Sequence, residues 1–103
     1  MPGSALLVAE KDGYVVGTLF VMAVPSFAHD GRPWGIIEHL DVDEKYHRQG
    51  FGHKLMETAI QICREANCYK VQLSSSKFRN EAHEFYRALG FEESALAFRM
   101  YFD

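Results

Sequence analysis

The sequence contains little of what marks a disulfide-stabilised, secreted or membrane-embedded protein. Its 103 residues include only two cysteines, too few for a disulfide framework, so both thiols are expected to be reduced. No apolar run is long enough to cross a bilayer, and no charged N-terminal segment precedes an apolar core and a cleavage site. We therefore expect a cytoplasmic protein with no membrane partner.

The chain also lacks a strong excess of charge of either sign. Its formal net charge is −3 at pH 7, so no overall field attracts nucleic acid, and we expect no nucleic-acid partner. The five histidines do not recur with carboxylates or cysteines at a metal-ligand spacing, so no metal site is expected. With 48% hydrophobic and 24% charged residues, the composition predicts a single globular domain over residues 1–103.

Hydrophobic periodicity predicts a mixed α/β fold in the order β-β-β-α-β-α-β. The turn sequence Lys11-Asp12-Gly13 joins the first two strands into an antiparallel hairpin. Helix 50–66 joins strands 34–42 and 69–73, so these two strands should be parallel, with a right-handed crossover. The predicted strands are residues 5–10, 14–24, 34–42, 69–73 and 96–102, and the predicted helices are 50–66 and 80–89.

A glycine-containing segment lies between the third strand and the first helix. It reads Tyr46-His47-Arg48-Gln49-Gly50-Phe51-Gly52-His53. The first N–H groups of a helix have no intrahelical partner, and glycine lets a ligand approach the backbone closely, so this segment predicts a site for a pyrophosphate. Arg48, His53 and Lys54 would add charge or donors around it. The structural alternative is a tight turn that binds no ligand. The spacing of the two glycines matches neither a P-loop nor a dinucleotide-binding fingerprint.

Two motifs carry a resemblance to a known family. The first, residues 47–52, resembles the Arg/Gln-x-x-Gly-x-Gly/Ala acetyl-CoA signature of the Gcn5-related N-acetyltransferase (GNAT) superfamily, with His47 in place of Arg or Gln. The second, residues 80–91, is similar to the family's Asn-x-x-Ala-x-x-Phe-Tyr-x-x-x-Gly-Phe segment. The resemblance covers residues 5–103. It implies a GNAT-like mixed β-sheet flanked by helices that lacks the strand and two helices usual before the hairpin.

The resemblance implies acetyl-CoA as cosubstrate. In the family, the backbone before the first motif splays from its neighbour and pairs with the pantetheine arm, and an N–H near Leu40 holds the thioester oxygen. An ordinary central strand is the alternative. The coenzyme-binding residues implied by the resemblance are Leu40, Asp41, Val42, His47, Arg48, Gln49, Gly50, Phe51, Gly52, His53, Asn80 and Tyr86.

Attack of an amine on a thioester needs a neutral amine, so a base or an ordered water must remove a proton. Glu38 is the leading candidate base, because the strand alternation places it between Ile36 and Leu40 on an apolar face and predicts its desolvation. A structural ion pair is the alternative role. His39, on the reverse face, is a second candidate base.

The second motif supplies the other candidate site residues. By resemblance, the Tyr86 hydroxyl protonates the departing thiolate, whereas the structural alternative is a helix tyrosine that packs beside Phe85. Asn80 is expected to contact the pantetheine and also to cap helix 81–89.

Two functions from different classes remain open. The first is an N-acetyltransferase that acts on a small-molecule amine, or on a protein lysine or N-terminal amine, by direct attack in a ternary complex. The second is an acyl-CoA-binding module without turnover, favoured by the expected absence of the N-terminal elements. The same absence leaves apolar surface uncovered and predicts a homodimer.

Overall fold

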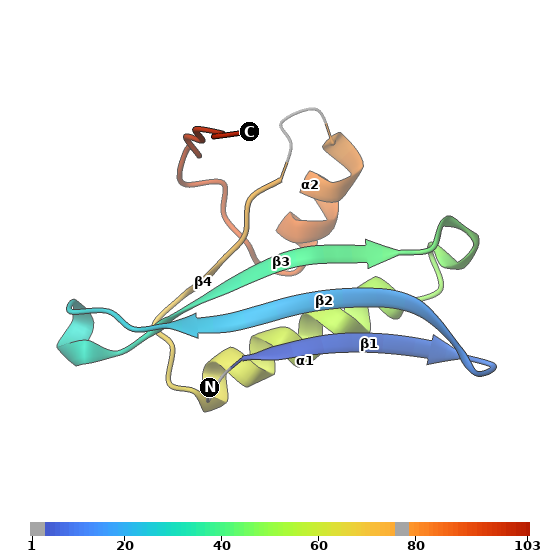
Figure 1. The fold of residues 1–103 in the computed structure, drawn as a ribbon, viewed down its shortest axis with the longest axis horizontal. Coiled ribbons are helices and arrows are strands. Elements are labelled where there is room, and N and C mark those ends of the chain that lie inside the picture. The colour runs from blue at the N-terminus through green and yellow to red at the C-terminus, as the bar shows by residue number, and fades with distance from the viewer. Residues whose placement is uncertain (1–3, 76–78) are drawn as a thin grey trace. The chain divides into compact units, whose positions relative to one another are not determined.

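The computed structural model describes residues 4–75 and 79–103 (Figure 1). The chain divides into two compact units, Met1–Leu73 and Ser74–Asp103, and each is described by itself. The elements are β1 (Ala5–Lys11), β2 (Tyr14–Val24), η1 (His29–Gly31), β3 (Trp34–Val42), η2 (Glu44–Tyr46), α1 (Phe51–Glu65), β4 (Val71–Gln72) and α2 (Asn80–Ala88). The predicted fold class, a mixed sheet with helices, is confirmed.

The hairpin of β1 and β2 closes through two residues. Lys11 pairs with Tyr14, and the two residues between them, Asp12 and Gly13, have φ values of 53° and 84°. Positive φ at both central positions is what a type I′ turn requires, and Asp-Gly is among the sequences that adopt it most readily. The predicted hairpin is confirmed.

The sheet of the first unit has the order β1-β2-β3-β4. β1, β2 and β3 are antiparallel neighbours, whereas β4 runs parallel to β3, as predicted. β4 is shorter than the predicted strand 69–73, because it pairs with β3 at only two positions, Gly35 with Val71 and Ile36 with Gln72. The later part of β3 therefore has no β4 residue beside it within residues 4–75.

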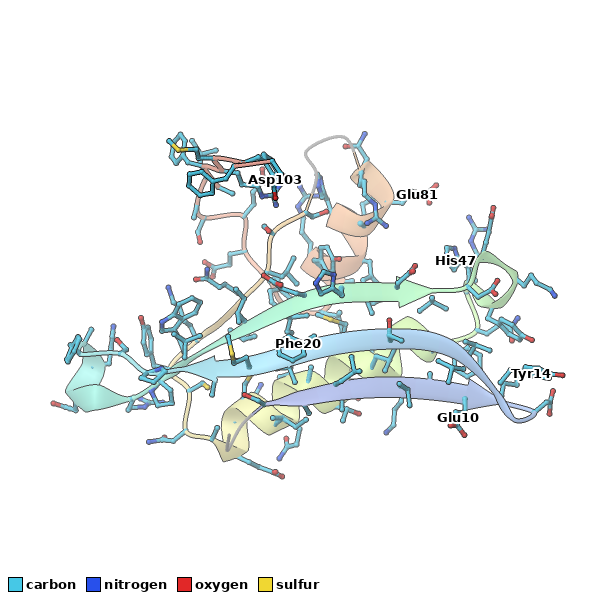
Figure 2. All side chains as sticks on the ribbon, viewed as in Figure 1. Glu10, Tyr14, Phe20, His47, Glu81 and Asp103 are labelled. Carbon is cyan, nitrogen blue, oxygen red and sulfur yellow. The ribbon has the colours of Figure 1, made fainter. Side chains whose placement is uncertain are left out.

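α1 covers one face of this sheet. Its buried side chains, Leu55, Met56, Ala59 and Cys63, follow helical spacing. They meet the buried side chains of the strands, which are Val16, Leu19, Val21, Ala23 and Ile37. Phe20, labelled in Figure 2, alternates with Leu19 and Val21 and therefore belongs to the opposite face.

α1 ends where the sequence predicted. Asn67, just past the helix, has φ 63°, and its N–H donates to Arg64 O at 3.0 Å. Cys68 N–H donates to Cys63 O, also at 3.0 Å. These two bonds make a Schellman motif, with asparagine in the left-handed position that glycine more often fills.

In the second unit, α2 is present but the predicted strand over residues 96–102 is not. A strand needs a neighbour for its backbone hydrogen bonds, and these residues have no ladder partner in the described part of the chain. Their large apolar side chains are exposed, among them Phe98 (91%) and Phe102 (90%). The element order is thus confirmed through α2, and the prediction of a seventh element was wrong. No helix within residues 4–75 or 79–103 has the length and apolar character needed to span a bilayer.

Gly35 lets α1 lie close to β3, and this contact can be tested. A Cβ at residue 35 would overlap Cys63 Sγ and lie 3.3 Å from Val71 Cγ2. We expect Gly35→Ala to lower the free energy of unfolding by about 2 kcal/mol through overpacking, measured by urea denaturation.

The control is the same substitution in a Cys63→Ala background, where the obstructing sulfur is absent. The double variant should lose less stability than the sum of the two single variants. Simple additivity would show that the Cys63 sulfur is not what residue 35 must avoid.

Candidate functional site

The loop from β3 to α1 is anchored at its start. Asp43 N–H donates to Val16 O at 2.8 Å, which ties the loop to β2. The Asp43 carboxylate accepts from Lys45 N–H at 3.0 Å and so caps η2. Sequence reasoning missed this role of Asp43, although an aspartate just before a polar turn is a capping signal.

His47 closes the same loop onto the end of β3. Its Nε2 lies 2.7 Å from Val42 O, across five residues of chain. A carbonyl oxygen can only accept a hydrogen bond, so Nε2 must carry the proton. In this structure the His47 imidazole holds the loop to the strand, and its expected contact with the coenzyme stays a prediction. Gln49 adds a further tie, from Nε2 to Lys45 O at 3.2 Å.

The loop ends in a backbone geometry that exposes amide groups. Arg48 and Gly50 have φ values of 63° and 88°, and Gly50 is the N-cap of α1 without a side-chain cap. The first helical bond runs from Lys54 N–H to Gly50 O at 3.0 Å. The amides of Phe51, Gly52 and His53 therefore precede the helical ladder. Such a run of free N–H groups beside a left-handed residue forms an anion-binding concavity.

The electrostatics of this helix start favour an anion. The first turn of α1 carries no acidic side chain, so nothing in it neutralises the positive end of the helix dipole. Arg48 and Lys54 are exposed beside it. His53 is also exposed, and its Nε2 lies 3.2 Å from the Glu57 carboxylate one turn on. A Cβ at Gly50 would meet nothing within 4 Å, so the space over this backbone is open.

β3 carries a bulge next to this loop. Thr18 pairs with Asp41 and Phe20 with Glu38, so two residues of β3, His39 and Leu40, lie opposite one residue of β2. His39 has φ 57°, a left-handed value within a strand. A bulge bends the strand and redirects the groups that follow it. The bulge therefore sets the direction of the backbone from Leu40 to Val42.

Glu38 is not desolvated as the sequence predicted. Its side chain is 53% exposed, and its carboxylate lies 3.7 Å from His39 Nε2. The reason is that Glu38 pairs with Phe20, on the sheet face that α1 does not cover. Glu38 and His39, which strict alternation would place on opposite faces, come close to each other because of the bulge.

Asn80 and Tyr86 lie on α2, in the second unit. Asn80 is the first helical residue rather than the cap, since Arg79 holds the N-cap position without a side-chain bond, and the predicted capping role was wrong. Tyr86 is half-buried, with edge contacts to Phe85 and Phe91 at centroid distances of 5.6 and 6.2 Å. Burial raises the pKa of Tyr86, against a smaller lowering by Arg79. The phenol is therefore protonated throughout the neutral range.

The first unit thus brings together the predicted residues of β3, of the loop and of the start of α1, which are Leu40, Asp41, Val42, His47, Arg48, Gln49, Gly50, Phe51, Gly52 and His53. Residues 4–75 and 79–103 contain no cluster of three or more side chains suited to hold a metal ion.

Known proteins resemble this chain in sequence and in fold. Residues 1–91 match the family described as "Acetyltransferase (GNAT) family". A glucosamine 6-phosphate N-acetyltransferase of Trypanosoma brucei brucei is 38% identical over 82 residues, which are 80% of this chain and 54% of that protein. Human N-alpha-acetyltransferase 30 is 37% identical over 67 residues, 65% of this chain and 18% of that protein.

Solved structures agree with the sequence matches. The crystal structure of glucosamine-6-phosphate N-acetyltransferase from Arabidopsis thaliana superposes with a TM-score of 0.92 at 28% identity, over 99% of this chain and 69% of that one. The chain spans 54% of the length of the trypanosomal relative and 61% of an Arabidopsis thaliana relative of the same name.

The bond between His47 and Val42 predicts one tautomer. We expect the neutral His47 imidazole to carry its proton on Nε2, because only that nitrogen faces the carbonyl. Long-range ¹⁵N–¹H correlation spectra of the labelled protein distinguish the tautomers. His29, whose ring stacks on Tyr69 at 3.8 Å, gives an internal comparison outside the loop. An Nδ1–H tautomer at His47 would contradict the loop closure.

Proposed function

Since this chain belongs to the GNAT family of acetyltransferases, we propose that it binds acetyl-CoA and transfers the acetyl group to a primary amine of a small molecule. The observation that carries the proposal is the start of α1, where free amides, an open Gly50 and no acidic side chain in the first turn coincide. A diphosphate is the part of acetyl-CoA that such a site fits.

The proposed acceptor class is an amino sugar phosphate. The supporting observation is that relatives at 38% and 30% identity are named glucosamine 6-phosphate N-acetyltransferases. A second candidate is a protein N-terminal amine, favoured by the 37% identity to N-alpha-acetyltransferase 30 over a shorter stretch. An acyl-CoA-binding module without turnover is the remaining alternative.

The proposed reaction is direct attack in a ternary complex. The amine nitrogen forms a bond to the thioester carbon, and the bond from that carbon to sulfur breaks. Glu38 takes the proton that the amine loses, since its exposed carboxylate is open to an incoming substrate. Tyr86, with its raised pKa, gives a proton to the departing thiolate. In the proposed complex, the backbone of Leu40 to Val42 pairs with the pantetheine arm.

The predicted homodimer and cytoplasmic location remain proposals. β1 stands at the end of the sheet, and its Leu6 and Val8 side chains are 67% and 49% exposed, which supports an interface there. Light scattering on the full chain would measure the oligomeric state, and a monomer at micromolar concentration would contradict the dimer.

Release of free thiol from acetyl-CoA tests the proposed activity. We expect saturable release with glucosamine 6-phosphate and slower or no release with a peptide N-terminus. Glu38→Gln and Tyr86→Phe should each lower kcat by about 100-fold, the effect typical of losing a general base or acid. Saturable binding of acetyl-CoA without thiol release on any amine would instead support the binding module. His39→Gln is the control that separates the two candidate bases.

Gly50 tests the coenzyme site with a matched control. Gly50 and Gly13 both have positive φ, 88° and 84°, and a Cβ at either meets nothing within 4 Å. Gly50→Glu and Gly13→Glu should therefore cost similar stability. Only Gly50→Glu places a carboxylate at the anion site, so it should weaken coenzyme A binding by about 100-fold, or about 2.7 kcal/mol, in calorimetric titration. Equal affinities of the two variants would contradict the proposed site.

A further inference from the structure

The two cysteines of the chain meet at the C-terminal end of α1, away from the helix start. Cys63 is the third residue from the end of the helix, and Cys68 is the second residue past its cap. The bond from Cys68 N–H to Cys63 O closes the Schellman motif between them. The residues at these two positions of the motif commonly touch each other through their side chains.

The two cysteines are neighbours across this turn, since Cys68 N–H donates to Cys63 O at 3.0 Å. Burial raises the pKa of the Cys63 thiol to about 11, and the adjacent Cys68 adds to the rise. Cys63 is buried, with 3% of its surface exposed, whereas Cys68 is half-buried. Cys68 is thus the more exposed of the two residues.

We propose that Cys63 and Cys68 are a modification site, at which a low-molecular-weight disulfide oxidises the two thiols to a reversible intramolecular disulfide. The site is independent of the acetyltransferase proposal, because neither cysteine belongs to the residues that it uses.

Cys68 reacts first with the oxidant, because it is the more exposed of the two cysteines. The Cys68 thiolate attacks one sulfur of the oxidant, forms a mixed disulfide and expels a thiolate. Cys63 then loses its proton and attacks the Cys68 sulfur, which expels the second thiolate. Two cysteine thiols are oxidised and the oxidant is reduced to two thiols. The raised pKa of Cys63 slows an attack on free reagents, but the turn holds it beside Cys68, where the local concentration is high.

A disulfide between Cys63 and Cys68 would stabilise the turn that also holds the loop between β2 and β3. Arg32 donates from Nε to Asn67 O at 3.1 Å and from Nη2 to Cys68 O at 3.2 Å, so the turn also anchors the loop between β2 and β3. A disulfide across the turn would fix both the last turn of α1 and this anchor. The oxidised form should therefore melt at a higher temperature than the reduced form.

Equilibration of the full chain with glutathione redox buffers tests the site. We expect the intact mass to fall by two hydrogen atoms, with a peptide that joins Cys63 to Cys68 after digestion, and full reversal by dithiothreitol. The oxidised protein should melt about 5 °C higher, since closing even a short loop stabilises the fold.

Cys68→Ser and Cys63→Ala are the controls, and neither should show the mass loss. Cys68→Ser, at the half-buried position, should leave Cys63 unreactive, whereas Cys63→Ala should trap a stable glutathione adduct on Cys68. A wild-type protein that stops at the adduct, or that forms only disulfides between chains, would overturn the proposal. A disulfide that forms without a rise in melting temperature would contradict the proposed stabilisation of the turn.

Discussion

The candidate site depends on how the first amides of α1 are held. A helix start offers N–H groups without partners, but they bind an anion well only when the preceding chain keeps them pointing together. Here three ties fix the preceding loop: Asp43 to the backbone of β2, His47 to the end of β3, and Gln49 to η2. The left-handed Gly50 then turns the chain into the helix.

The same loop is continuous with the bulged part of β3. The bulge at His39 lies three residues before Val42, whose carbonyl receives His47. β4 pairs with β3 only at Gly35 and Ile36, so the strand beyond Ile36 keeps backbone groups available on that side within the first unit. Within the first unit, a bulged strand that β4 leaves unpaired is therefore followed directly by a loop and a helix start with free amides. A long ligand with a polar arm and a diphosphate end suits such an arrangement.

Local sequence chemistry predicted much of the fold. The Asp-Gly turn, the helical stripe of α1 and the stop at Asn67 each depend on residues close in sequence, and all three were confirmed. The parallel pairing of β3 and β4 also followed, because the connection through a helix leaves little choice.

The features that sequence reasoning missed depend on how the elements pair in three dimensions rather than on local residue type. Residues 96–102 have the composition of a strand but no ladder neighbour within residues 4–75 and 79–103, and composition cannot supply one. The exposure of Glu38 depends on which sheet face α1 covers, and alternation within one strand cannot reveal that face. The 2.7 Å bond from His47 to Val42, which holds the loop to β3, is likewise visible only in three dimensions.

α1 connects these observations. Its packed face determines where the free amides at its start lie. The buried face of the helix packs on the sheet, and the close approach at Gly35 fixes its C-terminal half against β3. Packing along this face fixes the position of α1. The hydrogen bonds of the loop before α1 therefore orient the start of a helix that is already held in place. The direction of the amides at Gly50 is therefore a property of the whole first unit: the core positions the helix, and the loop closes onto it.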